Sequence, residues 1–443
     1  MRNLLATILD PLRCRLRRWQ IITLVLMVVG YSGIYLCRSN FSVALPLIER
    51  SLVDSGYDGT SARLWMGRIV TLGVLAYAIG KFITGSLADF LGGRRNVLVG
   101  MLGSVLFTIL FATGGALPLF TLAWVGNRAV QSLCWTGMVK ITGRWFSYSA
   151  YGTAMGVVSL SYLFGDAAAR QFMALLFRAG FGWREMFWAA AGLLFLFFVL
   201  NLLWLKESSL AIGQSEPAAN PLNVYGGRPQ DQEPPPNLRS LLVPLVTSGE
   251  FLVICLLSLG LTLLRETFNT WSPTYFVEVV GSSSAEAAGQ SALFPLLGGA
   301  SVLLAGWLGD RLGQGGRSLV MLGGCSLTTV VLWLLGSLHF TTDEIAPVLL
   351  VGLAGFLMLG PYSYLAGAIS LDLGGKRGGA TACGIIDGVG YLGGLLAGET
   401  IARLNIAYGW SGAFKALAGV ALLTSLAAAV FVGIQRQRRK IAR

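Results

Sequence analysis

Charged residues are scarce in this sequence. They make up 12% of its 443 residues, whereas about 25% is usual in soluble proteins, and 54% of the residues are hydrophobic. The single histidine and the scattered cysteines offer neither a metal cluster nor a disulfide framework. The sequence has no acid–base triad and no nucleotide-binding loop, so we expect neither an enzyme nor a cofactor. The composition is typical of a polytopic membrane protein.

Apolar runs recur at intervals of roughly 30 residues, which suits helices of about 20 residues joined by short loops. The basic N-terminal stretch lacks a small-residue cleavage site after a short apolar core, so we expect a retained first helix and no signal peptide. We predict an all-α membrane protein with twelve transmembrane helices, centred near residues 33, 78, 105, 128, 164, 195, 262, 298, 328, 357, 390 and 422.

Lysine and arginine are concentrated in alternate loops. The side that carries the termini has about twenty of them, and the opposite side has about four, at Arg50, Arg63, Arg178 and Arg184. Both termini are therefore predicted to be cytoplasmic, in an integral protein of a bacterial inner membrane. The net charge of +12 then reflects this topology and attraction to anionic lipid, and we expect no nucleic-acid partner.

One long polar stretch, rich in Pro, Gln, Gly and Asn, interrupts the apolar runs and cannot form a core. It divides the predicted helices into two sets of six. The predicted organisation is a cytoplasmic segment 1–18, a six-helix bundle 19–205, a cytoplasmic linker 206–240, a second six-helix bundle 241–434 and a basic cytoplasmic tail 435–443.

The two predicted bundles repeat one another. Arg38 in "CRSNFSVALP" precedes a proline by the same spacing as Arg265 in "LRETFNTWSP". "GSLADFLGGRR" at 85–95 is answered by "GWLGDRLGQGGR" at 306–317, and "TAMGVVSLSYLFG" by "TACGIIDGVGYLG". The matches keep their order and are offset by about 220 to 230 residues, which indicates a duplicated six-helix unit.

Parallel repeats joined by a cytoplasmic linker are the plan of the major facilitator superfamily. The loop at 85–95 resembles the signature of that superfamily, in which Gly85 permits close helix approach and Asp89 pairs with basic loop residues to latch the cytoplasmic face. The gating residues that this resemblance implies are Gly85, Asp89, Gly92, Arg94 and Arg95, with Asp310 and Arg311 in the second copy.

Ionisable side chains within membrane spans are costly and are functional candidates. The basic ones are Arg38, Lys81, Arg128, Lys140, Arg170 and Arg265, and the acidic ones are Asp166, Glu266, Asp387 and Glu399. Asp166 with Arg170, and Glu399 with Arg403, have the spacing of helical ion pairs and are expected to be structural. Lys140 lies near the end of its helix and is expected to extend to the water interface.

Arg38 and Arg265 each occupy the middle of the first helix of their bundle, so a pseudo-twofold axis would bring them to equivalent positions. Arginine binds phosphate or carboxylate through two parallel hydrogen bonds, and two such cations predict an anion site. Pairing of Arg265 with Glu266 is the alternative, but adjacent helical residues point about 100° apart, so we expect this pair to be poor. Lys81 adds a third cation on the second helix.

The sequence around these arginines resembles the organophosphate:phosphate antiporter family, in "GYSGIYLCRSNFSVALP", "AYAIGKFITGSLAD" and "LLRETFNTWSPTYFVEV". This resemblance implies that Arg38 and Arg265 hold a phosphoryl group, and that the cavity is lined by Lys81, Tyr31, Tyr35, Gln131 and Trp135. Tyr31 and Tyr35 lie on about the same helix face as Arg38, where a tyrosine either binds substrate or fills core.

The sequence departs from the pattern of this family at two positions. Tyr162 stands where the glycerol-3-phosphate transporters of this family have a histidine, and the chain's histidine, His339, is expected at an outer loop end. A glutamate of those transporters is also replaced here, near Pro295, which argues against a glycerol-3-phosphate specialist. Asp387 either binds sugar hydroxyls or lies at a helix interface.

The resemblance implies a carrier that exchanges an organophosphate, such as glucose-6-phosphate or glycerol-3-phosphate, for inorganic phosphate by alternating access. We expect this carrier to be a monomer. Repulsion between the two arginines would hinder reorientation of the empty carrier, and a bound anion would relieve it. A sugar-phosphate sensor that does not transport, and a carboxylate symporter of the same superfamily, remain alternatives.

Overall fold

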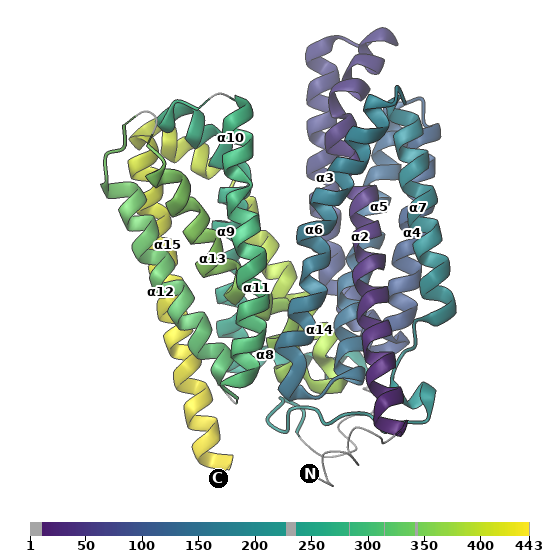
Figure 1. The fold of residues 1–443 in the computed structure, drawn as a ribbon, viewed down its shortest axis with the longest axis vertical. Coiled ribbons are helices and arrows are strands. Elements are labelled where there is room, and N and C mark those ends of the chain that lie inside the picture. Colours follow the sequence, from purple (N-terminus) through teal and green to yellow (C-terminus); the bar gives the residue numbers. More distant parts are fainter. Residues whose placement is uncertain (1–10, 227–235, 283, 314, 342–343, 443) are drawn as a thin grey trace. The chain divides into compact units, whose positions relative to one another are not determined.

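The described part of the chain is almost entirely helical (Figure 1). The structure is a computed structural model, and it describes residues 11–226, 236–282, 284–313, 315–341 and 344–442. Each of the twelve predicted helix centres falls within a long helix, so the helical prediction is confirmed. The long helices are α2 (Pro11–Asp54), α3 (Gly59–Leu91), α4 (Gly93–Thr113), α5 (Leu117–Trp145), α6 (Tyr151–Arg178), α7 (Trp183–Trp204), α9 (Gly249–Tyr275), α11 (Leu293–Arg311), α12 (Gly316–Ser337), α13 (Ala346–Tyr364), α14 (Ser370–Leu395) and α15 (Glu399–Ala442).

Nine segments of the described chain are long and apolar enough to cross a membrane. One of them, residues 346–395, covers both α13 and α14. No such segment falls on α5 or α6, which carry uncharged polar side chains as well as charged ones, among them Arg128 and Asp166. Arg38, Lys81 and Arg265 lie in segments that are apolar enough in spite of these charges, and ionisable side chains within membrane spans are functional candidates.

The chain divides into two compact units. The first comprises Met1–Ser147 and Val157–Ala218, and the second comprises Tyr148–Gly156 and Ala219–Arg443. The division after Ala218 falls inside the predicted linker. The expectation that nothing in this linker contributes to a core is wrong at its start, because Ser209 and Ile212 are buried in a short 3-10 helix, η2 (Ser209–Ile212), that follows α7.

Two of the long helices in the second unit are interrupted by glycine. In α14 the backbone leaves helical geometry at Gly375 and Gly378, within the stretch "GGKRGG". In α15 it does so at Gly409, where φ is 65°. A positive φ is readily adopted by glycine alone among common residues, so the chain changes direction at this point and then resumes its helix.

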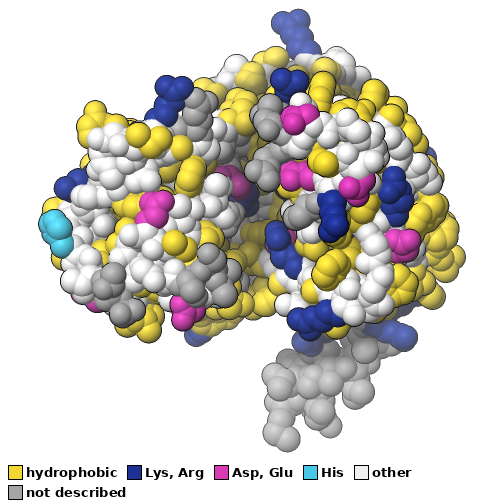
Figure 2. Space-filling view, turned by 90° about the horizontal axis from the view of Figure 1, so that it is seen from above, with side chains coloured by type: hydrophobic (Ala, Val, Ile, Leu, Met, Phe, Trp, Pro, Cys, Tyr) yellow, Lys and Arg dark blue, Asp and Glu magenta, His cyan; other side chains and the backbone are white. Residues whose placement is uncertain are grey.

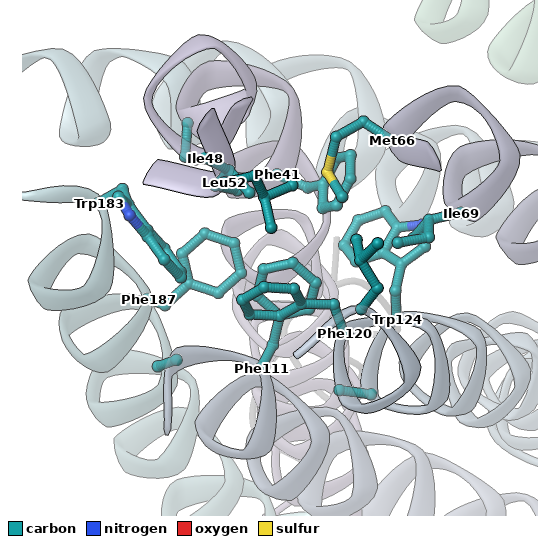
Figure 3. Packing of buried hydrophobic residues seen from close by; sticks show 14 of the residues in the cluster. Phe41, Ile48, Leu52, Met66, Ile69, Phe111, Phe120, Trp124, Trp183 and Phe187 are labelled. Carbon is teal, nitrogen blue, oxygen red and sulfur yellow. The ribbon is translucent and has the colours of Figure 1, made fainter. Parts of the chain in front are cut away.

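An aromatic core holds together one end of the first unit (Figure 3). Phe41 of α2 stacks on Trp124 of α5 with ring centroids 4.3 Å apart, and Phe111 of α4 stacks on Phe187 of α7 at 4.9 Å. Aromatic rings bury large apolar areas and prefer defined geometries, so this cluster fixes α2 and α5 relative to each other. Arg38 lies one turn before Phe41, and its helix is therefore anchored next to the site described below.

Large hydrophobic side chains are exposed along the outer faces of the helices. Leu106, Leu175 and Leu203 are 58%, 60% and 59% exposed, respectively. In Figure 2, hydrophobic side chains form much of the margin around the helix ends, where charged side chains gather. Such surfaces are stable in lipid and unfavourable in water. The protein is thus an integral, multi-pass membrane protein.

Candidate functional site: a cluster of buried cations

Three cations from three helices of the first unit surround one aromatic ring. The guanidinium carbons of Arg38 and Arg128 lie 5.1 and 4.6 Å from the centroid of Tyr77, and the ammonium nitrogen of Lys81 lies 4.8 Å from it. Lys81 is fully buried and Arg128 is 4% exposed. The π face of an aromatic ring carries negative potential, so Tyr77 contributes an attractive centre that partly offsets repulsion among the cations.

Tyr77 and Lys81 lie four residues apart on α3, so their side chains share one helix face. Arg38 comes from α2 and Arg128 from α5. The close approach of α5 depends on Gly73, one turn before Tyr77, because a Cβ at that position would lie 2.7 Å from Trp124 Cδ1 and 3.0 Å from Arg128 Cγ. Tyr77 was not among the predicted site residues, although its spacing of four residues from Lys81 places both side chains on one helix face.

The predicted aromatic residues extend from this cluster. Arg38 Nη1 donates a hydrogen bond to the Tyr35 hydroxyl at 3.5 Å. Ring centroids are 5.7 Å apart for Tyr31 and Tyr35, 5.5 Å for Tyr31 and Trp135, and 5.9 Å for Trp135 and Tyr162. The fold therefore brings Tyr31, Tyr35, Trp135 and Tyr162 into one series of ring contacts that begins beside Arg38.

Gln131 belongs to a buried polar network and positions Arg128. Arg128 Nη1 donates to Gln131 Oε1 at 3.1 Å, and Gln131 Nε2 donates to Ser104 Oγ at 3.1 Å and Asn127 Oδ1 at 2.9 Å. Asn127 Nδ2 in turn donates to the backbone carbonyl of Cys37 at 3.1 Å. Because the network is buried and bonded on α2, α4 and α5, it holds the Arg128 guanidinium in one orientation.

In the second unit, Arg265 of α9 lies over the ring of Tyr362 of α13, with its guanidinium carbon 4.5 Å from the ring centroid. Arg265 also forms an ion pair with Glu266. The prediction that this adjacent pair would be poor is wrong, because both side chains are long enough to bend across the angle between their Cβ directions.

Asp387 is half-buried on α14. That helix packs closely on α9, where a Cβ at Gly390 would lie 2.6 Å from Thr262 Oγ1.

The signature loop of the first unit is held by partners that the sequence did not reveal. Asp89 accepts a hydrogen bond from Lys140 Nζ at 2.7 Å, and both side chains are buried. Lys140 therefore does not extend to the water interface as predicted, and α5 supplies a partner of Asp89 that the sequence did not indicate. The helix geometry explains this, since α5 passes directly beside the end of α3 and supplies a cation at that depth.

Gly92, with φ of 96°, forms the turn between α3 and α4. The first amides of α4 bind a carboxylate, because Gly93 N and Arg94 N donate to Glu207 Oε1 and Oε2 at 3.0 and 2.7 Å. Arg94 also donates to the carbonyls of Leu202 and Leu205, at 2.7 Å each. The loop thus docks on the end of α7, while Arg95 is exposed and Gly85 is buried on α3.

The second copy of this loop uses Arg317 and not the predicted Arg311. Arg317 Nη2 donates to Asp310 Oδ1 at 2.6 Å, and Arg317 also pairs with Asp372. Asp310 accepts backbone hydrogen bonds from Gly152 at 3.0 Å and Thr153 at 2.6 Å, so it caps the start of α6. Arg311 is exposed over Trp307, because it follows Asp310 directly and points away from it.

The predicted helical ion pair of Asp166 and Arg170 is confirmed, with 3.0 Å between Oδ2 and Nε. Asp166 also accepts a hydrogen bond from Ser39. The predicted pair of Glu399 and Arg403 includes Glu399, which lies outside the residues whose side chains are described. His339 is exposed in the segment that follows α12, as expected.

These features define a class of protein: a multi-pass helical membrane protein with a repeated sequence and half-buried arginines, Arg38 and Arg265, at equivalent positions of the repeat. The profile of the Major Facilitator Superfamily matches residues 27–398. The chain belongs to this superfamily.

Similar proteins of known name agree with the resemblance to the organophosphate:phosphate antiporter family. The chain is 25% identical over 410 residues to the glycerol-3-phosphate transporter of Bacillus subtilis, covering 89% of this chain and 88% of the other. It is 26% identical over 421 residues to a probable hexose phosphate transport protein of Chlamydia muridarum, covering 92% and 90%. It is also 25% identical over 433 residues to the membrane sensor protein UhpC of Escherichia coli, covering 96% and 94%.

Solved structures share the fold. The human organic anion transporter MFSD10 superposes with a TM-score of 0.68 at 15% identity, covering 92% of this chain and 99% of the other. The proton:xylose symporter XylE gives 0.68 at 14% identity, covering 93% and 95%.

Proposed function

We propose that the protein transports a phosphate ester across the membrane in exchange for inorganic phosphate, by alternating access of its two six-helix halves. The observation that carries the proposal is Arg38, a guanidinium held beside Tyr35, Tyr77 and Lys81 within a membrane span. Arginine remains charged when buried and binds phosphoryl oxygens through two parallel hydrogen bonds. The relatives named as glycerol-3-phosphate and hexose phosphate transport proteins support a phosphate ester as substrate.

Arg265 is assigned the same role in the second half, because the repeat in the sequence gives it the position of Arg38. Its ion pair with Glu266 is made through Nη2. A guanidinium carries five N–H donors, so a phosphoryl group can bind another edge of Arg265 or displace the carboxylate. Glu266 also neutralises Arg265 in the absence of anion, so repulsion between arginines is a weaker barrier to reorientation than the sequence suggested.

The remaining proposed roles follow from position. Lys81 and Tyr35 contribute donors next to Arg38, while Tyr31, Gln131, Trp135 and Tyr162 shape the site, and Asp387 is assigned to the organic part of the substrate. The two signature loops are proposed to control opening at the cytoplasmic side through Asp89 and Asp310. We infer that the carrier acts as a monomer in a bacterial cytoplasmic membrane, with its basic loops on anionic lipid.

A sensor of sugar phosphates is the second candidate, and the similarity to membrane sensor protein UhpC along nearly the whole chain favours it. A sensor would bind the ester through the same arginines but would not move it. Binding without exchange in liposomes would therefore select the sensor.

The test is exchange of labelled phosphate in proteoliposomes preloaded with phosphate, measured for the wild type, Arg38→Lys and Arg265→Lys. Lysine keeps the charge and loses the two-pronged donor. Loss of one charge-assisted hydrogen bond, worth about 1.5–3 kcal/mol, predicts that the rate of phosphate exchange falls by about 10- to 150-fold. Arg68→Lys is the matched control, because Arg68 is exposed and lies over Trp65.

Normal exchange in either arginine variant would remove that arginine from the site. Inhibition of exchange by a dicarboxylate and not by phosphate would replace the proposal with a carboxylate carrier.

A further inference from the structure

The linker that joins the two halves is docked on the protein in two successive segments. The first segment, residues 206–216, is built into the first unit. Arg144 binds two of its carboxylates, with 3.2 Å between Nη1 and Glu207 Oε1 and 2.8 Å between Nη2 and Glu216 Oε1. Glu207 also accepts the first backbone amides of α4. The chain is therefore fixed on the first unit as far as Glu216.

The second segment, residues 220–225, is docked on the second unit. The backbone amide of Val224 donates a hydrogen bond to the carbonyl of Leu373 at 2.8 Å. The ring of Tyr225 fills the space above Gly378, where a Cβ would lie 2.6 Å from Tyr225 Cε2. The segment is thus held against the break in α14, at a place where only glycine leaves room for the ring.

The end of α15 also contacts this second segment. Arg438 Nη1 lies 3.5 Å from the carbonyl oxygen of Leu222, and the same guanidinium forms an ion pair with Glu250 at 2.7 Å. The Glu250 side chain is 4% exposed, so Arg438 is held in place from within the second unit. The predicted basic tail therefore contributes to the docking of the linker.

Residues 217–219 connect the two docked segments. They lie outside any helix or turn, and Ala218 is exposed. Four residue steps separate the Cα atoms of Glu216 and Asn220, and a fully extended chain spans at most about 14 Å over four steps. A linker of about 35 residues that was free over its whole length would instead reach about 120 Å. The reach of this linker is therefore set by where it is docked and not by its length.

We propose that the docked linker is a tether that limits how far the two halves separate at their linker side when the carrier opens there. This inference rests on the proposed alternating access, in which the two halves move relative to each other. Once the latch at Asp310 has released the start of α6, residues 217–219 keep the two attachment points within about 14 Å. Wider opening requires residues 220–225 to leave α14, so the contacts of Val224 and Tyr225 set the limit.

Insertions at two positions distinguish a short tether from a flexible linker. Ten Gly and Ser residues inserted after Ala218 lengthen the tether from three residues to thirteen and raise its r.m.s. span to about 20 Å. The same insertion in a linker free over about 35 residues would change the r.m.s. span by only about 13%. An identical insertion after Gln230 is the matched control, because it follows the second docked segment and leaves the tether unchanged.

The measurement is the distance distribution between two spin labels, one in each half, by pulsed EPR in lipid nanodiscs with and without phosphate. The labels are placed at Arg17→Cys on α2 and Leu312→Cys at the end of α11, since both positions are exposed. Cys14 is replaced by serine, and the other five cysteines are buried.

The insertion after Ala218 should move the upper edge of the distribution outward by about 6 Å or more, whereas the insertion after Gln230 should leave it in place. Val224→Pro removes the N–H that binds Leu373 and should produce the same outward shift. Val224→Ala keeps this N–H and should not. Exchange of labelled phosphate by each variant confirms that it is folded.

An unchanged distribution after the Ala218 insertion would overturn the inference, as would an equal shift after the Gln230 insertion. The two insertions alone decide the matter if Val224→Pro does not fold. The distances are measured whatever the substrate is. Absence of phosphate exchange in the wild type would therefore refute the proposed function without changing these outcomes, and the two failures are distinguishable.

Discussion

The ion pair of Asp89 and Lys140 offers the most quantitative test of how this fold is held together. Lys140→Met removes the cation and leaves the Asp89 carboxylate, whose side chain is fully buried, without its ammonium partner. At 2.7 Å and an effective dielectric of about 20, the direct attraction is about 6 kcal/mol, and desolvation of both groups offsets much of it. Removal of one member of a buried pair typically costs about 3–5 kcal/mol, and we expect a loss in this range.

The double variant Asp89→Asn with Lys140→Met should lose clearly less than the sum of the two single variants, because neither charge is then buried alone. The measurement is the free energy of unfolding in mixed micelles, from a denaturant titration followed by circular dichroism. Arg170→Met is the matched control, since its partner Asp166 is four residues away and the Arg170 side chain is 54% exposed. It should lose about 0.2–0.5 kcal/mol.

A loss below about 1 kcal/mol in Lys140→Met would refute this account of the loop. Additive losses in the double variant would show that the two side chains act independently.

Two further predictions concern packing and the second loop. Gly73→Ala should destabilise the protein by about 1–3 kcal/mol, because its Cβ would lie 2.7 Å from Trp124 Cδ1. Gly67→Ala on the same helix is the control, since its Cβ meets no atom within 4 Å, and it should be neutral or stabilising. Equal effects of the two variants in the same unfolding titration would contradict the close approach of α3 and α5. Arg317→Met should lower the free energy of unfolding by about 3–5 kcal/mol, because it removes the cation that Asp310 and Asp372 share. Arg311→Met should lower it by less than about 0.5 kcal/mol. The reverse order would show that Arg311, and not Arg317, stabilises the second loop.

The charged residues differ in how far their partners could be predicted from the sequence. The i,i+4 pair of Asp166 and Arg170 was predictable, since helical geometry alone brings residues at that spacing together. Lys140 was mispredicted, because proximity to a helix end suggests exposure, and only the neighbouring helix supplies Asp89 as a partner. The pairing of Glu266 with Arg265 was expected to be poor because adjacent residues on a helix point in different directions. Both side chains are long enough to meet across that angle.

The sequence by itself determined that this is a membrane protein, where its helices lie and that its two halves are repeats, because apolar runs and repeated motifs are properties of continuous stretches of chain. It also located Arg38 and Arg265, since a charge in an apolar run is visible without a fold. Only the tertiary structure decided which side chains of different helices meet. The Tyr77 cluster draws on α2, α3 and α5, and Asp310 meets Gly152 from 158 residues away. Such contacts arise from helix packing, which no local pattern in the sequence encodes.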